Sequence, residues 1–261
     1  MPSYHFNTSR RVRTLRTTMI EASLTYLRDG DDAVTTAVIG GLLLLASPLV
    51  IPSILVFGYL ARVLRRTADG DDDPPVFGAW GELFVDGLKA FAVAFVYSLL
   101  PLAVVAVAAT VTLGAFVVVP GTADGGAGTF FGTFVVGVLV LVVGLVALAL
   151  SLVGLYVTPA ALAAVADSGK VGDGFAVGAL WGVVTKRAYA TGWATAAVVV
   201  LAGALAIGVL SVVPILGTIA GVFVQFYALV AAAAIVGWTW ADVRPVATEP
   251  PEPEPAERPV V

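Results

Sequence analysis

Three arginines form the clearest candidate binding cluster in the sequence. Arg62, Arg65 and Arg66 are spaced by three and four residues, so on a helix they share one face. Guanidinium groups bind phosphate well, and a basic cluster beside an apolar segment is typical of a site for anionic lipid headgroups. Simple anchoring predicts the same pattern, because positive residues gather on the cytoplasmic side of membranes. Both interpretations place guanidinium groups against lipid phosphate.

The acidic run that follows offers oxygen atoms without the pattern of a metal site. Asp69, Asp71, Asp72 and Asp73 stand directly before two prolines and lack the ligand spacing of a calcium-binding loop. We interpret them as a solvated turn. His5 is the only histidine and cysteine is absent, so the sequence predicts no catalytic triad and no zinc site. We therefore expect no enzyme activity, no cofactor and no metal.

Two further features lie inside a long apolar stretch. Gln225 is the most polar residue far from any charge. It could contact a substrate or a pore, but we favour a hydrogen bond between helices, which is the common role of polar residues there. Gly217 and Gly221 have the four-residue spacing that lets helices approach closely, so we expect helix packing at these positions.

The composition indicates the solvent in which these residues act. Of the 261 residues, 59% are hydrophobic and 12% are charged, with a net charge of −4 and a mean hydropathy of +0.98. A soluble domain has about 25% charged residues and cannot hide this much apolar surface. These values exclude a disordered chain, a nucleic-acid-binding protein and an ordinary water-soluble enzyme. They predict a multi-pass protein of the cell membrane, with the lipid bilayer as its surroundings.

Four uncharged stretches contain the predicted spans: residues 33–61, 90–123, 125–166 and 188–241. A helix needs about 20 apolar residues to cross the hydrocarbon layer. The last stretch is long enough for two crossings, with a break at Pro214. The predicted fold class is therefore all-α, a polytopic bundle of membrane helices.

The first uncharged stretch is unusual because Pro48 and Pro52 interrupt it. It is either one kinked span or a re-entrant hairpin of two short helices. Arginines that favour the cytoplasm occur on both sides of residues 33–61, which argues for the hairpin. We predict four full spans plus one proline-broken segment. The alternative is five full spans with an external amino terminus.

Amphipathic segments and a tail complete the predicted organisation. Residues 1–32 contain five arginines between apolar residues at helical spacing, which predicts a helix on the membrane surface. Interfacial helices are also predicted around Trp80 and Trp181, on the cytoplasmic side. The membrane domain then covers residues 33–240. Residues 241–261 contain six prolines and four glutamates, which is typical of a disordered tail, here placed in the cytoplasm.

The two halves of the chain repeat one arrangement. Each has an apolar span, a tyrosine, an acidic loop, an amphipathic segment with Phe and Trp, and then basic residues. Tyr59 lies 18 residues before Phe77, and Tyr156 lies 19 residues before Phe175. Paired repeats are common among membrane transporters, so the pattern suggests an internal repeat.

Two motifs carry a resemblance to a known family. The run GYLARVLRR at residues 58–66 and the run PVFGAWGELFVDGLK at 75–89 resemble prokaryotic membrane proteins catalogued as domain of unknown function 4013 (DUF4013), which are abundant in archaea. The resemblance covers about residues 20–240. The acidic loops and tail look like those of halophilic archaea. The resemblance implies a polytopic membrane protein and brings no activity and no functional residues.

Two functions are compatible with these features. The interfacial helices, the proline-rich tail and spans without ionisable groups other than tyrosine favour a non-enzymatic scaffold. Such a scaffold would organise lipids or a membrane or cytoplasmic protein partner. The repeat and the broken first segment favour the alternative, a transporter or channel for small solutes or lipids. A water-accessible path through the spans would distinguish the two.

Overall fold

The computed structural model describes residues 17–30, 32–118 and 127–244, and all the regular elements in these ranges are helices. The predicted all-α fold is therefore confirmed for this part of the chain. In order, the elements are α1 (Thr17–Tyr26), α2 (Ala33–Leu45), α3 (Val50–Ala68), α4 (Trp80–Val118), α5 (Ala127–Ser168), the 3-10 helix η1 (Val171–Phe175), α6 (Val177–Val184), α7 (Arg187–Leu210) and α8 (Leu216–Val243).

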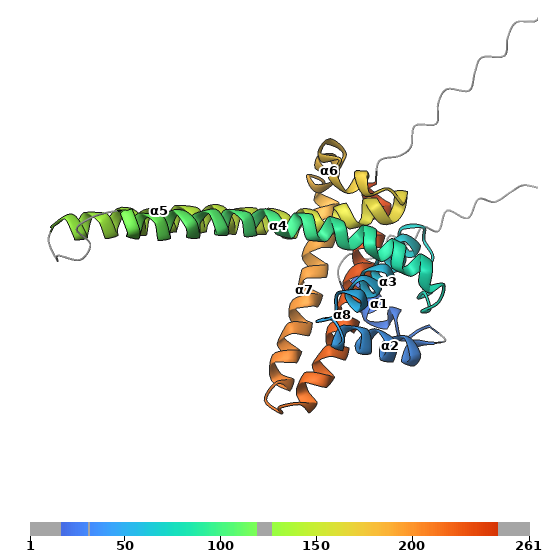
Figure 1. Ribbon diagram of the computed structural model, residues 1–261. Coiled ribbons are helices and arrows are strands. Elements are labelled where there is room, and N and C mark those ends of the chain that lie inside the picture. The colour runs from blue at the N-terminus through green and yellow to red at the C-terminus, as the bar shows by residue number, and fades with distance from the viewer. Residues whose placement is uncertain (1–16, 31, 119–126, 245–261) are drawn as a thin grey trace, which may run out of the picture.

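The chain builds two long helical hairpins on a shared base (Figure 1). Helices α4 and α5 form the hairpin that extends to the left, and α7 and α8 form the hairpin that extends downward. The shorter helices α1, α2, α3 and α6 gather around the base, where the hairpins meet. Each of the four hairpin helices is long and apolar enough to cross a membrane, in agreement with the four predicted spans.

The proline-rich stretch at 33–61 is divided into two helices. α2 ends at Leu45 and α3 begins at Val50, and the turn between them contains Ser47 and Pro48. Pro52 lies in the first turn of α3. Backbone N–H groups in a first turn have no acceptor within the helix, so the proline removes no helical hydrogen bond there. With 13 residues, α2 is about 20 Å long, which is shorter than the hydrocarbon layer of about 30 Å.

α5 continues through a proline at which the sequence predicts a kink or an end. Pro159 lies inside the helix, which extends to Ser168. The turns beyond it cross the base, where Ala160 and Ala161 are fully buried. The small side chains let α5 pass close to its neighbours. This packing offsets the free-energy cost of the backbone hydrogen bond that the proline removes.

The hydrophobic core lies in the base and is built around α8. Its largest fully buried side chains include Tyr59, Phe226, Leu83 and Ile235. Half of the most apolar 18-residue window of α8 is buried inside the chain, against 11% for α4 and 6% for α5. The α4–α5 hairpin therefore presents its apolar side chains outward, as helices surrounded by lipid do.

The predicted interfacial segments pack into the base or adjoin it. The ring of Tyr26, at the end of α1, lies 6.0 Å from that of Trp238 in α8 in an edge-to-face arrangement. Trp80 begins α4, and Trp181 lies in α6; both indole rings are largely exposed. Residues 1–16, which hold much of the predicted amphipathic helix, lie outside the described residues. So does the predicted tail from residue 245 onward.

Candidate functional site: the charged base

Arg62 connects the end of α3 to the start of α4. Its guanidinium donates hydrogen bonds to the carbonyl oxygens of Gly78 at 2.8 Å and Ala79 at 3.2 Å, and lies 4.0 Å from the Glu82 carboxylate. Ala79 has a φ of 47°, a conformation that residues with side chains seldom adopt. Because the Arg62 side chain is only 13% exposed, its main role in this fold is to hold this turn before α4.

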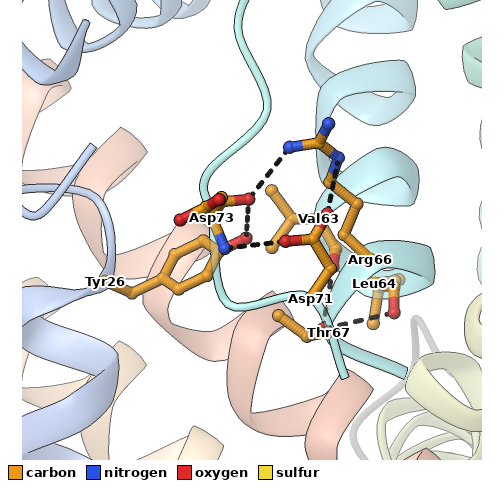
Figure 2. Close-up of polar contacts among 7 residues, drawn as sticks. All are labelled: Tyr26, Val63, Leu64, Arg66, Thr67, Asp71 and Asp73. Carbon is orange, nitrogen blue, oxygen red and sulfur yellow. Dashed lines mark hydrogen bonds and ion pairs between the residues drawn. The ribbon is translucent and has the colours of Figure 1, made fainter. Parts of the chain in front are cut away.

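Arg66 holds the acidic loop against α3, as Figure 2 shows. Its Nη1 donates to the carbonyl oxygen of Asp73 at 3.1 Å, and its Nε lies 3.4 Å from the Asp71 carboxylate. Asp71 also accepts a hydrogen bond from the backbone N–H of Asp73 at 3.0 Å, which closes a local turn. The Tyr26 hydroxyl donates to the Asp73 carbonyl at 3.4 Å, and burial raises the pKa of this phenol although Arg66 opposes the shift.

Arg65 has a third set of partners. Its guanidinium lies 3.7 Å from the carboxylate of Asp86 in α4, which also lies 3.8 Å from the Lys89 ammonium group. The three arginines of the predicted lipid site therefore each bind a different part of the same junction. Arg65 and Arg66 keep 44% of their side-chain surface exposed, whereas Arg62 is mostly covered.

Two glycines that the sequence reasoning did not single out allow α3 and α4 to touch. A Cβ atom added to Gly58 would overlap the carbonyl oxygen of Leu83, and one added to Gly87 would overlap that of Ile54. The ring of Tyr59, next to Gly58, stacks on Phe77 with 4.5 Å between centroids. These glycines belong to the two motifs at 58–66 and 75–89. The motifs that carry the family resemblance thus form one packed unit.

Side chains at the carboxyl end of α8 bind carboxylates in the acidic loop after α3 and in the last turn of α5. Nη1 of Arg244 lies 3.0 Å from the carboxylate of Asp167, in the last turn of α5, and 3.6 Å from that of Asp69, which follows α3. Trp240 Nε1 donates to the other oxygen of Asp167 at 3.0 Å, and Trp238 Nε1 donates to Asp72 at 2.9 Å. Sequence reasoning missed this contact because the partners are 73 to 175 residues apart.

The two halves of the suggested repeat differ in their aromatic contacts, although an aspartate from each half contacts the same arginine. Asp69 and Asp167, one from each half, meet at the same arginine. In the first half Tyr59 stacks on Phe77, but Phe175 of the second half stacks on Tyr97 at 5.8 Å. The aromatic packing of the two halves is therefore not equivalent.

Gln225 lies in an open groove that contains none of the charged residues of the base. The groove has a volume of about 310 Å³ and is lined by residues from α2 and the turn after it, from the end of α7 and from α8: Leu44, Ser47, Ile207, Ser211, Thr218, Gly221, Val222 and Gln225. Gln225 is exposed, and among the described residues its carboxamide has no hydrogen-bond partner. No hydrogen bond from Gln225 to another helix is therefore made among the residues that the structure describes.

Gly217 and Gly221 lie where α7 and α8 approach each other. A Cβ atom on Gly217 would overlap the carbonyl oxygen of Leu210, and one on Gly221 would lie 3.2 Å from a methyl carbon of Ile207. Both glycines are buried. The structure therefore places them at a close helix contact within the chain.

The described fold belongs to a recognisable class: an all-α protein with four helices that are long and apolar enough to cross a membrane. The family model described as "Protein of unknown function (DUF4013)" matches residues 41–215, and the chain belongs to this family. The matched region runs from α2 to the turn before α8 and includes both motifs of the α3–α4 junction. No curated protein and no solved structure matches the chain.

Proposed function

We propose that this protein is a non-enzymatic scaffold of the cell membrane that gathers partner membrane proteins or lipids along its α4–α5 hairpin. The supporting observation is the exposure of this hairpin. Only 6% of the apolar window of α5 and 11% of that of α4 are buried inside the chain, against 50% for α8. Membrane helices associate through close packing, so a hairpin with few internal contacts has most of its surface available to partners.

A shallow apolar groove between the two helices gives this surface its shape. It has a volume of about 370 Å³ and is lined from α4 by Ala103, Val104, Val107 and Ala108, and from α5 by Leu139, Val143 and Val146. The two alanines leave room for an apolar side chain or a lipid chain between the helices. This groove is the contact site that the scaffold proposal assigns.

The charges of the base support a cytoplasmic location for the base and the tail. Positive residues favour the cytoplasmic side, and several basic residues bind partners in the base: Arg62, Arg65, Arg66, Lys89 and Lys186. α8 ends in the same region, at the Arg244 contacts, and this agrees with the predicted cytoplasmic side for the residues that follow. The turn between α7 and α8 then faces the outside.

Contacts around α2 and α3 support a re-entrant first segment. Tyr26 precedes this segment and Asp73 follows it, and the hydroxyl of the first donates to the carbonyl oxygen of the second. A Cβ on Gly30 would lie 3.0 Å from Pro74. Because the two ends of the segment meet in the base, it enters and leaves on one side. This arrangement favours four full spans plus a re-entrant hairpin over five spans.

The exposed guanidinium groups support a role in binding lipid headgroups. Arg65 and Arg66 have surface available beside their carboxylate partners, and the base lies where the headgroups of the cytoplasmic leaflet would be. Anionic phosphates attract such groups by about 1 kcal/mol for each basic residue near the surface. Arg62 is mostly covered, and its role here is to hold the turn before α4 in place.

Site-specific photo-crosslinking in native membranes tests the scaffold. A benzophenone amino acid replaces Val107 or Leu145 of the hairpin, which are 63% and 56% exposed, and Leu205 of α7, 74% exposed, serves as the control. We expect discrete protein adducts or an enriched lipid species from the hairpin positions only. If those positions capture no protein and the same lipid mixture as Leu205, the proposal fails.

A transporter or channel for small solutes or lipids is the second candidate, and the polar groove at Gln225 favours it. Transport of a polar solute requires water in the groove. A cysteine at Val222 would then react with a membrane-impermeant thiol reagent, as a cysteine at the exposed hairpin tip, Val212, is expected to do. The scaffold proposal expects Val222→Cys to remain unreacted.

A further inference from the structure

We propose that two copies of this chain associate through Gln225 of α8. Gln225 is exposed, and in the described part of the chain its carboxamide has no hydrogen-bond partner. It lies about 14 Å along α8 from Leu216, and this distance is about half the thickness of a hydrocarbon layer of about 30 Å. Lipid tails cannot hydrogen bond, so an unpaired amide at this depth carries a free-energy cost that a partner would remove.

The chemistry of the side chain selects a second copy as that partner. A carboxamide has both donors and an acceptor, so two facing Gln225 side chains exchange two hydrogen bonds. In a dimer with a two-fold axis, the same residue of each copy can meet at the axis. Each amide thereby pairs its oxygen and one of its two N–H groups with the other copy, and one N–H of each amide still needs an acceptor.

The groove around Gln225 supports this pairing. Thr218, Gly221, Val222 and Gln225 recur at helical spacing and line the groove along α8. Thr218 and Gln225 are exposed to a second copy, whereas Gly221 is buried against Ile207 of the same chain. Ser211, on the α7 side, donates its hydroxyl proton to the carbonyl oxygen of Ile207 at 2.7 Å.

Ser47, on the α2 side, donates in the same way to Leu43 at 3.3 Å. The oxygen lone pairs of both serines remain free to accept the remaining N–H of a partner's carboxamide. The groove therefore offers acceptors as well as space for the second copy. This contact involves α2, α7 and α8 and is independent of the α4–α5 surface.

Crosslinking of single cysteines in native membranes tests the dimer. The natural chain has no cysteine. Val222→Cys keeps Gln225 and lies on the same face of α8, whereas Leu205→Cys lies on the opposite side of α7 from the groove residues Ile207 and Ser211. A short bis-maleimide is expected to link two copies of Val222→Cys and not two copies of Leu205→Cys.

Substitution of Gln225 in the Val222→Cys variant tests whether the carboxamide causes the association of the two copies. Gln225→Leu keeps the size and removes the amide, and it should weaken dimerisation about tenfold, measured by energy transfer between labelled copies in lipid nanodiscs. Gln225→Asn should retain part of the effect. Equal crosslinking from both cysteine positions, or crosslinking that Gln225→Leu leaves unchanged, would overturn the proposal. So would reaction of Val222→Cys with an impermeant reagent, because water would then occupy the groove.

Discussion

Gly58 of α3 and Gly87 of α4 pack backbone against backbone. A Cβ on Gly58 would lie 3.2 Å from the nitrogen of Gly87, and a Cβ on Gly87 would lie 2.9 Å from the nitrogen of Gly58. No side chain fits between the helices at this point. The close approach brings Arg62 within reach of the turn before α4 and stacks Tyr59 on Phe77. The rest of the charged base depends on it.

Substitution of Gly87 should therefore destabilise the base. Gly87→Val forces a branched side chain against the carbonyl oxygen of Ile54, and overpacking of this kind costs about 1–3 kcal/mol or more. Gly81→Ala in the same helix is the control, because nothing lies within 4 Å of the new atom. Thermal unfolding in detergent should show a lower midpoint for Gly87→Val only. Equal midpoints would show that the α3–α4 contact is not close.

The three arginines should differ in their effect on stability. Arg62→Ala removes two hydrogen bonds to carbonyl oxygens from a mostly buried guanidinium, and we expect a loss of about 1–3 kcal/mol. Arg65→Ala removes an exposed ion pair and should cost less than about 1 kcal/mol. Equilibrium unfolding in mixed micelles measures both. A larger loss for Arg65→Ala would contradict the assigned roles.

Tyr59→Phe is expected to stabilise the protein. The Tyr59 hydroxyl is buried and has no hydrogen-bond partner among the described residues, and such a group costs about 1–3 kcal/mol. Tyr189 provides the matched control, because its buried hydroxyl donates to the carbonyl oxygen of Tyr156 at 2.7 Å. In the same unfolding experiment, Tyr189→Phe should destabilise. A loss of stability in both variants would mean that the Tyr59 hydroxyl is paired.

Alkaline pH should destabilise the base through Tyr26. Burial raises the pKa of this phenol above its ordinary value of 10.0, and Asp71, Asp72 and Asp73 act in the same direction while Arg66 opposes them. The folded state therefore holds this proton more tightly than the unfolded state. Its contribution to stability is fully present below pH 10 and decreases as the pH rises above that value.

Tyr26→Phe removes the titrating group. Unfolding free energies measured between pH 9 and pH 12 should fall less steeply for this variant than for the natural chain. Other buried tyrosines retain part of the slope. Identical slopes in the two proteins would show that Tyr26 ionises equally in the folded and unfolded states.

Much of the secondary structure follows from local sequence properties. Uncharged stretches of sufficient length predict the four long helices, because a lipid-exposed backbone must satisfy its hydrogen bonds internally. Pro48 predicts the break between α2 and α3, since proline has no N–H to donate and disfavours a helical residue before it. At Pro159 the same local rule predicts a kink or an end, and the structure shows that α5 does not end there.

The sequence by itself determined that this chain is an all-α protein for an apolar solvent, because hydropathy and charge are properties of local segments. The tertiary structure alone decided what the polar residues do. Spacing placed Arg62, Arg65 and Arg66 on one helical face, but their partners came from the following loop and α4. Arg244 binds Asp69 and Asp167 from distant loops, and Gln225 lies in a groove made by three segments. Such contacts depend on how helices pack over long sequence separations, which no local pattern encodes.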